Sequence, residues 1–220
     1  MNRGIIFDCD GTLINSIGKT MESFQYALRK VDHKSYSNED IQKYFGSGAD
    51  RIFKNLLKDE TKAGAAFDYY LAHQYELANQ MDLHFGISEL LDVIQEENIP
   101  ISIVTGRHAR DLEIVLARHQ LTARFVTLVT DSDVAKSKPS PEGLLLAAER
   151  MGLDPKNTFY VGDSKIDIQA ARAAGSKGVA AMWDNLTVLD DMKKENPDFI
   201  AETPMDVWEY FVSISQKSDL

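Results

Sequence analysis

The sequence predicts an α/β protein, a doubly wound parallel sheet whose chain is interrupted after the first strand by a helical insertion. Two patterns in the 220 residues lead to this expectation. From residue 84 onward, short apolar runs alternate with helical patterns, which is typical of βαβ units. Residues 15–82 hold helical patterns and no convincing strand. We therefore expect one unit formed by residues 1–14 and 83–220, and a second formed by residues 15–82.

Each expected strand is a short apolar run, and the first of them, at residues 4–7, ends directly in carboxylates. The other strands are expected at residues 101–105, 125–129, 158–163 and 178–183, with a weaker one at 199–200. Helices are expected between them, at residues 87–97, 109–119, 141–151 and 166–174. Helix breakers and C-caps lie at the ends of these helices, as they should. These are Gly86, Pro100, Gly152 and Gly175.

Three apolar stripes at helical spacing identify the insertion, which the chain enters near Ile14 and leaves near Leu83. The stripes are Met21, Phe24, Leu28 and Val31, then Ile52, Phe53, Leu56 and Leu57, then Phe67, Leu71, Tyr75 and Ala78. The ordinary meaning of such stripes is a packed core, and we expect them to be buried.

Charge and composition exclude several classes of function. The net charge of -10 argues against a nucleic-acid or anionic-membrane surface, because phosphate groups are held by clustered Lys and Arg. The single cysteine, Cys9, permits no intrachain disulfide and fits a reducing compartment. No stretch approaches the ~18 unbroken apolar residues of a membrane span. We expect a cytoplasmic protein, and either a monomer or a homodimer fits the sequence.

Two aspartates follow the first strand, in the segment Asp8-Cys9-Asp10-Gly11-Thr12. In an open parallel sheet the ligand crevice lies beyond the carboxyl ends of the strands. Side chains two residues apart on an extended chain point the same way, which would bring two carboxylates together. A cation or unequal sharing of protons would have to relieve their repulsion. An acidic turn or a helix N-cap explains this segment equally well when it is taken alone.

The other strand ends supply groups that complement these carboxylates. The segment TGR at residues 105–107 offers a hydroxyl, a glycine amide that an anion can approach closely, and a cation. Asp163 and Asp167 are four residues apart at a helix start, so both can face one site. Lys138 precedes a helix that Pro141 would begin. Carboxylate oxygens suit Mg²⁺, and Lys138 would balance phosphate charge.

These segments resemble, in order and spacing, the four motifs of the haloacid dehalogenase superfamily. They are DCDGT at residues 8–12, TGR at 105–107, KPSPE at 138–142 and GDSKID at 162–167. The resemblance covers the whole chain. It implies a Rossmann-like core, a helical cap at residues 15–82, and Mg²⁺-dependent hydrolysis of a small phosphorylated metabolite.

The resemblance also implies a role for each residue. Asp8 attacks phosphorus to form an aspartyl-phosphate, and Asp10 is general acid to the alcohol and general base to water. Mg²⁺ is bound by Asp8, by the main-chain carbonyl of Asp10 and by Asp163, with Asp167 binding directly or through water. Lys138 also offsets the charge of Asp8. The residues expected to bind the substrate are Thr12, Arg51, Thr105, Gly106, Arg107 and Lys138.

Three positions distinguish activities within the superfamily. Dehalogenases lack the second aspartate of the first motif, so Asp10 favours phosphoryl chemistry. Sugar-phosphate mutases commonly carry an acidic residue where this chain has Gly162, so hydrolysis is favoured over phosphotransfer. The second motif usually reads Ser or Thr, then Asn and Lys, and TGR departs from it at Arg107.

The cap loop at residues 46–51 resembles the corresponding segment of phosphoglycolate phosphatases. This makes 2-phosphoglycolate a candidate substrate, with Arg51 pairing with its carboxylate. Pyrophosphate, sugar phosphates and nucleotides are the alternative substrates. A phosphomutase and a non-catalytic binding protein are the alternative functions.

Overall fold

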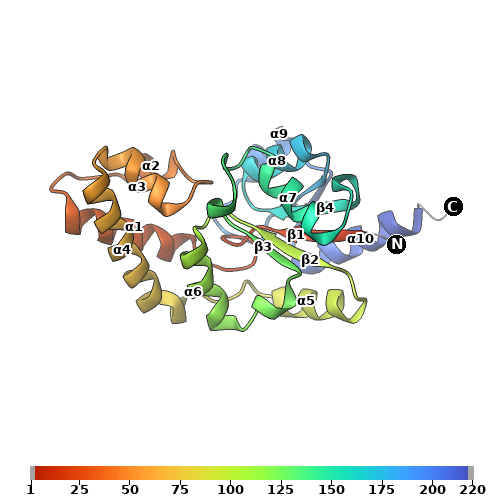
Figure 1. Ribbon diagram of the computed structural model, residues 1–220. Coiled ribbons are helices and arrows are strands. Elements are labelled where there is room, and N and C mark those ends of the chain that lie inside the picture. The colour runs from red at the N-terminus through yellow and green to blue at the C-terminus, as the bar shows by residue number, and fades with distance from the viewer. Residues whose placement is uncertain (1–2, 218–220) are drawn as a thin grey trace.

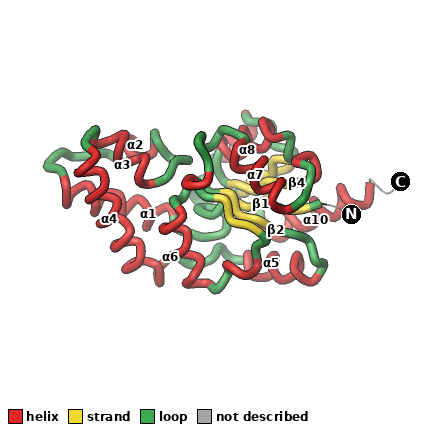
Figure 2. Tube along the Cα trace, viewed as in Figure 1, coloured by secondary structure: helices red, strands yellow, loops and turns green. Residues whose placement is uncertain are grey.

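The computed structural model describes residues 3–217 and consists of a parallel sheet between two layers of helices, with a helical unit beside it (Figures 1 and 2). The six strands run in the order β3-β2-β1-β4-β5-β6, and every neighbouring pair is parallel. Their bounds are β1 (Gly4–Phe7), β2 (Ile101–Val104), β3 (Thr127–Val129), β4 (Thr158–Gly162), β5 (Lys177–Ala181) and β6 (Phe199–Ala201). The doubly wound sheet that the sequence predicts is confirmed.

The two layers of helices cover opposite faces of the sheet. One layer contains α5 (Ile87–Glu96), α6 (Ala109–His119) and α10 (Pro204–Lys217), and the other contains α7 (Glu142–Met151), α8 (Lys165–Ala174) and α9 (Leu189–Lys194). Alternate side chains of a strand point to opposite faces. Accordingly, Ile5 and Phe7 of β1 pack in the cluster that includes α5 and α10, whereas Ile6 packs in the cluster that includes α7 and α8.

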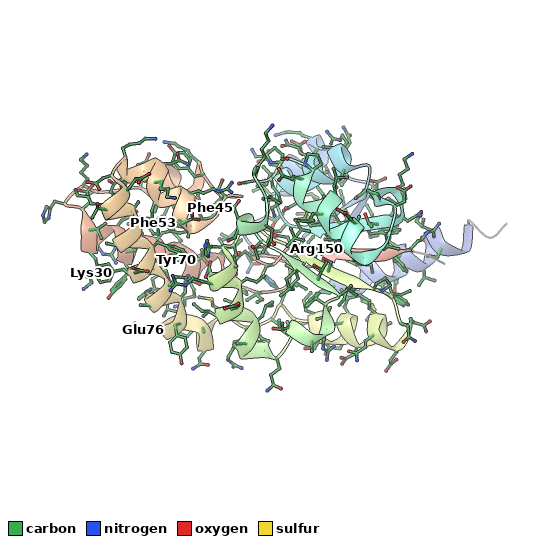
Figure 3. The ribbon with its side chains drawn as sticks, viewed as in Figure 1. Lys30, Phe45, Phe53, Tyr70, Glu76 and Arg150 are labelled. Carbon is green, nitrogen blue, oxygen red and sulfur yellow. The ribbon has the colours of Figure 1, made fainter. Side chains whose placement is uncertain are left out.

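The insertion forms the helical unit at the left of Figure 1. Its helices are α1 (Ile17–Val31), α2 (Asn38–Gln42), α3 (Ala49–Leu57) and α4 (Glu60–Leu77). They bury a cluster of aromatic rings, in which the ring of Phe24 lies 5.2 Å from Phe53 and 4.7 Å from Tyr70 between centroids. Phe53 and Tyr70 point into the space between these helices (Figure 3). The insertion therefore has an apolar core of its own, which we call the cap core.

The expected stripe on α4 is wrong at one position. Tyr75 is 75% exposed, whereas Phe67, Tyr70, Leu71 and Gln74 are buried. These four lie at i, i+3, i+4 and i+7, which is one face of a helix, and Tyr75 lies beyond its edge.

Two adjacent segments connect the cap helices to the sheet. Ile14 forms a bridge with Leu83, close to the expected points of entry and exit. The Asn15 N–H donates to the Asp82 carbonyl at 2.9 Å, and the His84 N–H donates to the Leu13 carbonyl at 3.0 Å. The chain thus leaves and re-enters the sheet unit at one place.

Several boundaries differ from the expected ones. β3 begins at Thr127 and not at residue 125, because a 3₁₀ turn at Thr122–Arg124 comes directly before Phe125. The helix α10 is not among the expected elements. It begins at Pro204, and proline suits the first position of a helix. None of the helices between residues 3 and 217 combines the length and apolar character needed to cross a bilayer.

Truncation of a cap-core ring should destabilise the protein. Phe53 is fully buried, and we expect Phe53→Ala to lower the free energy of unfolding by about 3–5 kcal/mol, the usual cost for a buried phenylalanine. Urea unfolding would measure it. Tyr75→Ala, on the exposed side of the neighbouring helix, is the control and should change stability by less than about 0.5 kcal/mol. Equal losses for both variants would contradict this packing.

Candidate active site

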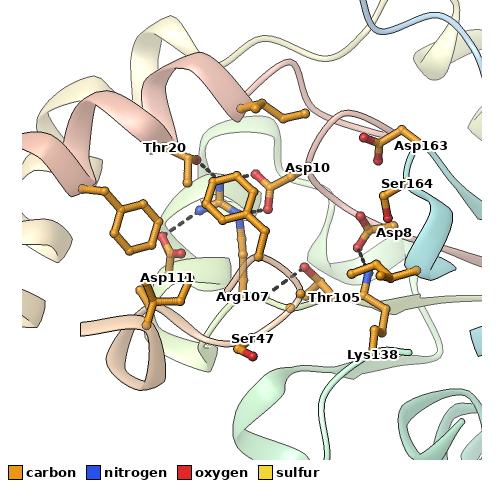
Figure 4. A pocket seen from close by; sticks show the side chains of 18 of the residues that line it. Asp8, Asp10, Thr20, Ser47, Thr105, Arg107, Asp111, Lys138, Asp163 and Ser164 are labelled. Carbon is orange, nitrogen blue, oxygen red and sulfur yellow. Dashed lines mark hydrogen bonds and ion pairs between the residues drawn. The ribbon is translucent and has the colours of Figure 1, made fainter. Parts of the chain in front are cut away.

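Three carboxylates meet beyond the carboxyl ends of the two central strands. Asp8 follows β1 directly, is 7% exposed, and donates its backbone N–H to the Val161 carbonyl of β4 at 2.8 Å. Asp163 follows β4, and Asp167 lies in the first turn of α8. One oxygen from each carboxylate lies within 4.8 Å of the others. Figure 4 shows Asp8 and Asp163 on one side of the pocket.

Two glycines allow these carboxylates to come so close. Gly11 has φ of 72°, and a Cβ there would lie 2.5 Å from Asp163 Oδ2. At Gly162, a Cβ would lie 2.4 Å from the Cβ of Asp167. Thr12 fixes the orientation of Asp163, because its hydroxyl donates to Oδ1 at 3.0 Å.

Lys138 lies between two of the carboxylates. Its Nζ is 2.9 Å from Asp8 Oδ1 and 2.6 Å from Asp167 Oδ1. It also donates to the Tyr160 hydroxyl at 3.0 Å, and that hydroxyl donates to the Val104 carbonyl at 2.9 Å. The other oxygen of Asp167 accepts from the hydroxyl and the N–H of Ser164. Asp167 is therefore held on both sides and in turn holds Lys138.

Burial determines the proton affinities in this cluster. It raises the pKa of Asp8 to about 7, against the opposing charge of Lys138. Burial and the neighbouring Asp167 raise the pKa of Asp163 well above its usual range. Although burial disfavours the charged form of Lys138, Asp167 and Asp8 hold its pKa well above normal. One ammonium does not compensate two buried carboxylates and the half-buried Asp163, and a hard divalent cation with oxygen ligands fits this set.

Asp10 is held by Arg107. The Arg107 Nε lies 2.9 Å from Asp10 Oδ2, and its Nη2 lies 2.6 Å from Asp10 Oδ1, which is a bidentate pair. Ser16 donates its hydroxyl to the same carboxylate. Arg107 is 4% exposed. The side chain of Asp10 thus points away from the three-carboxylate cluster and toward α1 and α6 (Figure 4).

The remaining hydrogen bonds of Arg107 reach the cap. Its Nη1 donates to Asp111 Oδ1 at 2.7 Å and to Gln74 Oε1 at 3.2 Å, and its Nη2 donates to the Thr20 hydroxyl at 3.0 Å. Asp111 in turn accepts from the Tyr70 hydroxyl at 2.9 Å. Because Thr20, Tyr70 and Gln74 belong to α1 and α4, the orientation of Asp10 depends on the position of the cap helices.

Thr105 and Gly106 follow β2 and form the floor of the pocket. The Arg107 N–H donates to the Thr105 hydroxyl oxygen at 3.1 Å, which leaves the hydroxyl proton free for another acceptor. A Cβ on Gly106 would lie 2.9 Å from the backbone of Gly46. The cap loop therefore packs directly on this turn, and only glycine fits there.

The structure places Arg51 away from the pocket. Its Nε is 3.0 Å from Asp131 Oδ2, and its amino groups donate to the carbonyl oxygens of Asp131, Val134 and Ala135 and to the Ser137 hydroxyl. Arg51 is therefore a link between α3 and the loop that follows β3.

A cavity of about 130 Å³ lies between the sheet and the cap. Seven of the expected site residues line it together, namely Asp8, Asp10, Thr105, Gly106, Arg107, Lys138 and Asp163. Thr12 and Asp167 support this set through Asp163 and Lys138. Four residues that the sequence analysis did not single out complete the site, namely Thr20, Tyr70, Gln74 and Asp111. Of these, Asp111 had a signal in the sequence, since it is four residues after Arg107 and a helix brings such residues together.

The family model of the haloacid dehalogenase-like hydrolases matches residues 5–181. The chain belongs to this family. Among curated proteins it is similar to pyrophosphatase PpaX of Oceanobacillus iheyensis, with 30% identity over 93% of this chain and 94% of the relative. It is also similar to the phosphoglycolate phosphatase of Escherichia coli K12, with 28% identity over 82% of this chain and 81% of the relative.

A solved structure has the same fold. The crystal structure of a hydrolase from Pseudomonas syringae superposes with a TM-score of 0.83 and covers 96% of this chain and 99% of its own, at 23% identity. The family match and the curated relatives together identify the haloacid dehalogenase-like protein described here as a phosphatase.

Replacement of Arg107 should impair the reaction of bound substrate more than its binding. Arg107→Lys keeps the charge but loses the bidentate grip on Asp10. We expect kcat to fall about 10²-fold with KM changed less than about threefold, because small displacements of a reacting group cost this much. Steady-state kinetics would measure both parameters.

Arg110→Lys is the matched control, since Arg110 is exposed on the same helix. It should leave both parameters unchanged. A rise in KM with unchanged kcat for Arg107→Lys would mean that Arg107 holds the substrate and not Asp10.

The raised pKa of Asp8 should make the free energy of unfolding depend on pH when a chelator keeps the protein free of metal. Because the pKa of Asp8 is about 7 in the folded protein and 3.8 for an ordinary aspartate, the folded protein keeps a proton between these values that the unfolded chain loses. This contribution is full below about pH 4 and is lost as the pH rises through about 7. Asp8→Asn cannot ionise, so its stability relative to the parent should increase as the pH rises from about 4 to about 7 and stay level above that. Urea unfolding in chelator checks this, and a pH-independent difference would contradict it.

Proposed function

We propose that this protein hydrolyses a small phosphomonoester, with Mg²⁺ bound, through a phosphoaspartate on Asp8. The observation that carries the proposal is the meeting of Asp8, Asp163 and Asp167 within 4.8 Å, with Lys138 Nζ 2.9 Å from Asp8. Paired carboxylates with a fixed lysine at a strand end suit the binding of a phosphoryl group by a metal and a cation.

Asp8 would act as the nucleophile. Its carboxylate forms a bond to phosphorus while the bond from phosphorus to the alcohol oxygen breaks. Lys138 holds one oxygen of this carboxylate, so the other, Oδ2, is the one we assign to attack. The Thr105 hydroxyl and the Gly106 N–H would donate to the phosphoryl oxygens.

Asp10 would transfer the protons. It gives a proton to the leaving alcohol, and it then takes one from the water that attacks phosphorus and releases phosphate from Asp8. Arg107 supports this role through position, because its guanidinium fixes both carboxylate oxygens of Asp10 beside the cavity.

The carboxylates of Asp8, Asp163 and Asp167, together with the main-chain carbonyl of Asp10, would hold Mg²⁺. The raised pKa values of Asp8 and Asp163 support this. Desolvation disfavours the ionised form of both carboxyl groups, and a nearby cation would stabilise that form. Mg²⁺ would neutralise phosphoryl oxygens as charge develops on them. Asp167 has both oxygens occupied by Lys138 and Ser164, which favours its reaching the ion through water.

Hydrolysis is preferred over transfer to a second substrate hydroxyl. Gly162 stands where sugar-phosphate mutases commonly carry an acidic residue, and Asp167 fills the space beside it, since a Cβ on Gly162 would lie 2.4 Å from the Asp167 Cβ. The relatives' names make 2-phosphoglycolate and pyrophosphate the first substrates to compare. A cytoplasmic location fits this use of a small metabolite.

Release of inorganic phosphate tests the proposal. We expect Mg²⁺-dependent turnover of at least one member of a panel of 2-phosphoglycolate, pyrophosphate, sugar phosphates, nucleotides and alkyl phosphates. Chelation should abolish turnover and added Mg²⁺ should restore it. Asp8→Asn should lower kcat by at least about 10⁴-fold, because it removes the nucleophile.

Asp133→Asn is the control, since Asp133 lies outside the cavity and pairs with Arg150. It should retain activity. Turnover that survives Asp8→Asn would exclude the phosphoaspartate, and transfer of phosphate to a second substrate in place of water would identify a phosphotransferase.

A further inference from the structure

The cavity has a cap side that the proposed chemistry does not use. Uncharged side chains from α1, the loop before α3, α3 and α4 line it. Most of them are apolar or aromatic, namely Ile17, Phe24, Phe45, Ala49, Ile52 and Tyr70, and the hydroxyls of Thr20 and Ser47 lie among them. Asp8, Lys138 and Asp163 line the sheet side of the same cavity. A phosphoryl group held on the sheet side would therefore direct its alcohol toward these apolar groups.

The cations that line this cavity are already paired. Among the described residues that line it, Lys138 and Arg107 are the cationic ones. Lys138 contacts Asp8 and Asp167, and Arg107 contacts Asp10 and Asp111. A second anionic group on the substrate would thus meet no cation that is unpaired.

The cap loop does not supply the missing cation. Arg51 pairs with Asp131 and with carbonyl oxygens outside the cavity. The beginning of α3 is a position where helix amides could bind an anion. Two carboxylates lie there already, since a Cβ on Gly48 would be 2.7 Å from Asp131 Oδ2 and 2.8 Å from Asp50 Oδ1. These carboxylate oxygens already lie at the beginning of α3, so the position is not open to an anion of the substrate.

The geometry points to a substrate whose leaving alcohol is small, apolar and uncharged, and not one that carries a carboxylate or a second phosphate. This inference rests on the proposed function and names the substrate class of the same site. Phe24, Phe45 and Ile52 line the cavity, so an anionic leaving group would have to be buried among apolar side chains with no unpaired cation beside it. An alkyl group would instead gain from burial.

A ranked series of substrates tests this assignment. We expect kcat/KM to rise about fourfold for each added methylene from methyl to propyl phosphate, which corresponds to ~0.8 kcal/mol per buried methylene. Propyl phosphate should exceed both 2-phosphoglycolate and pyrophosphate by at least about tenfold. A higher kcat/KM for either anionic substrate would overturn the inference and leave the phosphatase function intact.

Substitution of Ser47 provides a matched pair of variants. Ser47 lines the cavity and is half-buried, so a longer side chain can be accommodated at its edge. Ser47→Lys adds a cation, whereas Ser47→Met adds a chain of similar length without charge. We expect the ratio of kcat/KM for 2-phosphoglycolate to that for propyl phosphate to be at least tenfold higher in Ser47→Lys. Equal ratios in the two variants would overturn the inference, because a cation added to the cavity would then not favour an anionic leaving group.

Binding gives an answer that does not depend on turnover. Calorimetry of Asp8→Asn with Mg²⁺ should give a lower Kd for propyl phosphate than for 2-phosphoglycolate, and the opposite order would overturn the inference. The parent protein could also hydrolyse none of the substrates while the Kd values follow the expected order. That result would count against the proposed function and would leave the preference for an apolar group intact.

Discussion

The arrangement of this site depends on the compensation of buried negative charge at the carboxyl ends of β1 and β4. Asp8, Asp163 and Asp167 lie within 4.8 Å, and Lys138 contacts two of them. Removing one partner from such a cluster leaves an uncompensated buried charge, which is strongly destabilising. Gly11 and Gly162 permit the close approach, and Tyr160 fixes the lysine. The cluster therefore suits the cation and the phosphoryl group that we propose to bind there.

A second cluster connects this chemistry to the cap. Arg107 holds Asp10 on one side and reaches Thr20 and Gln74 on the other. A helical unit that closes over an active site can exclude water and select the leaving group. Here the cap also determines where Asp10 points. Movement of α1 and α4 would thus change the position of Asp10 and of the apolar wall of the cavity together.

The sheet and its strand-end residues were predictable because they depend on local patterns. Apolar runs predict the strands, and the carboxyl ends of parallel strands lie at one edge of the sheet. This brings Asp8 after β1 and Asp163 after β4 together, with Lys138 from the loop between β3 and α7. The partners of Arg107 and Arg51 were not predictable in the same way. They depend on how helices distant in sequence pack, since Gln74 is 33 residues from Arg107 and Asp131 is 80 from Arg51. Tyr75 is exposed, contrary to the expectation from the sequence, because the buried face of α4 is centred on Tyr70.

The most direct test of the account is to look for the phosphoryl group on Asp8. Protein that is turning over substrate with Mg²⁺ would be quenched in acid, digested, and analysed by mass spectrometry. We expect one added phosphoryl group on the peptide that contains Asp8, assigned to Asp8 by fragmentation and absent from Asp8→Asn. Active turnover with no phosphoryl group on Asp8 at any quench time would contradict it, because water would then attack the substrate directly.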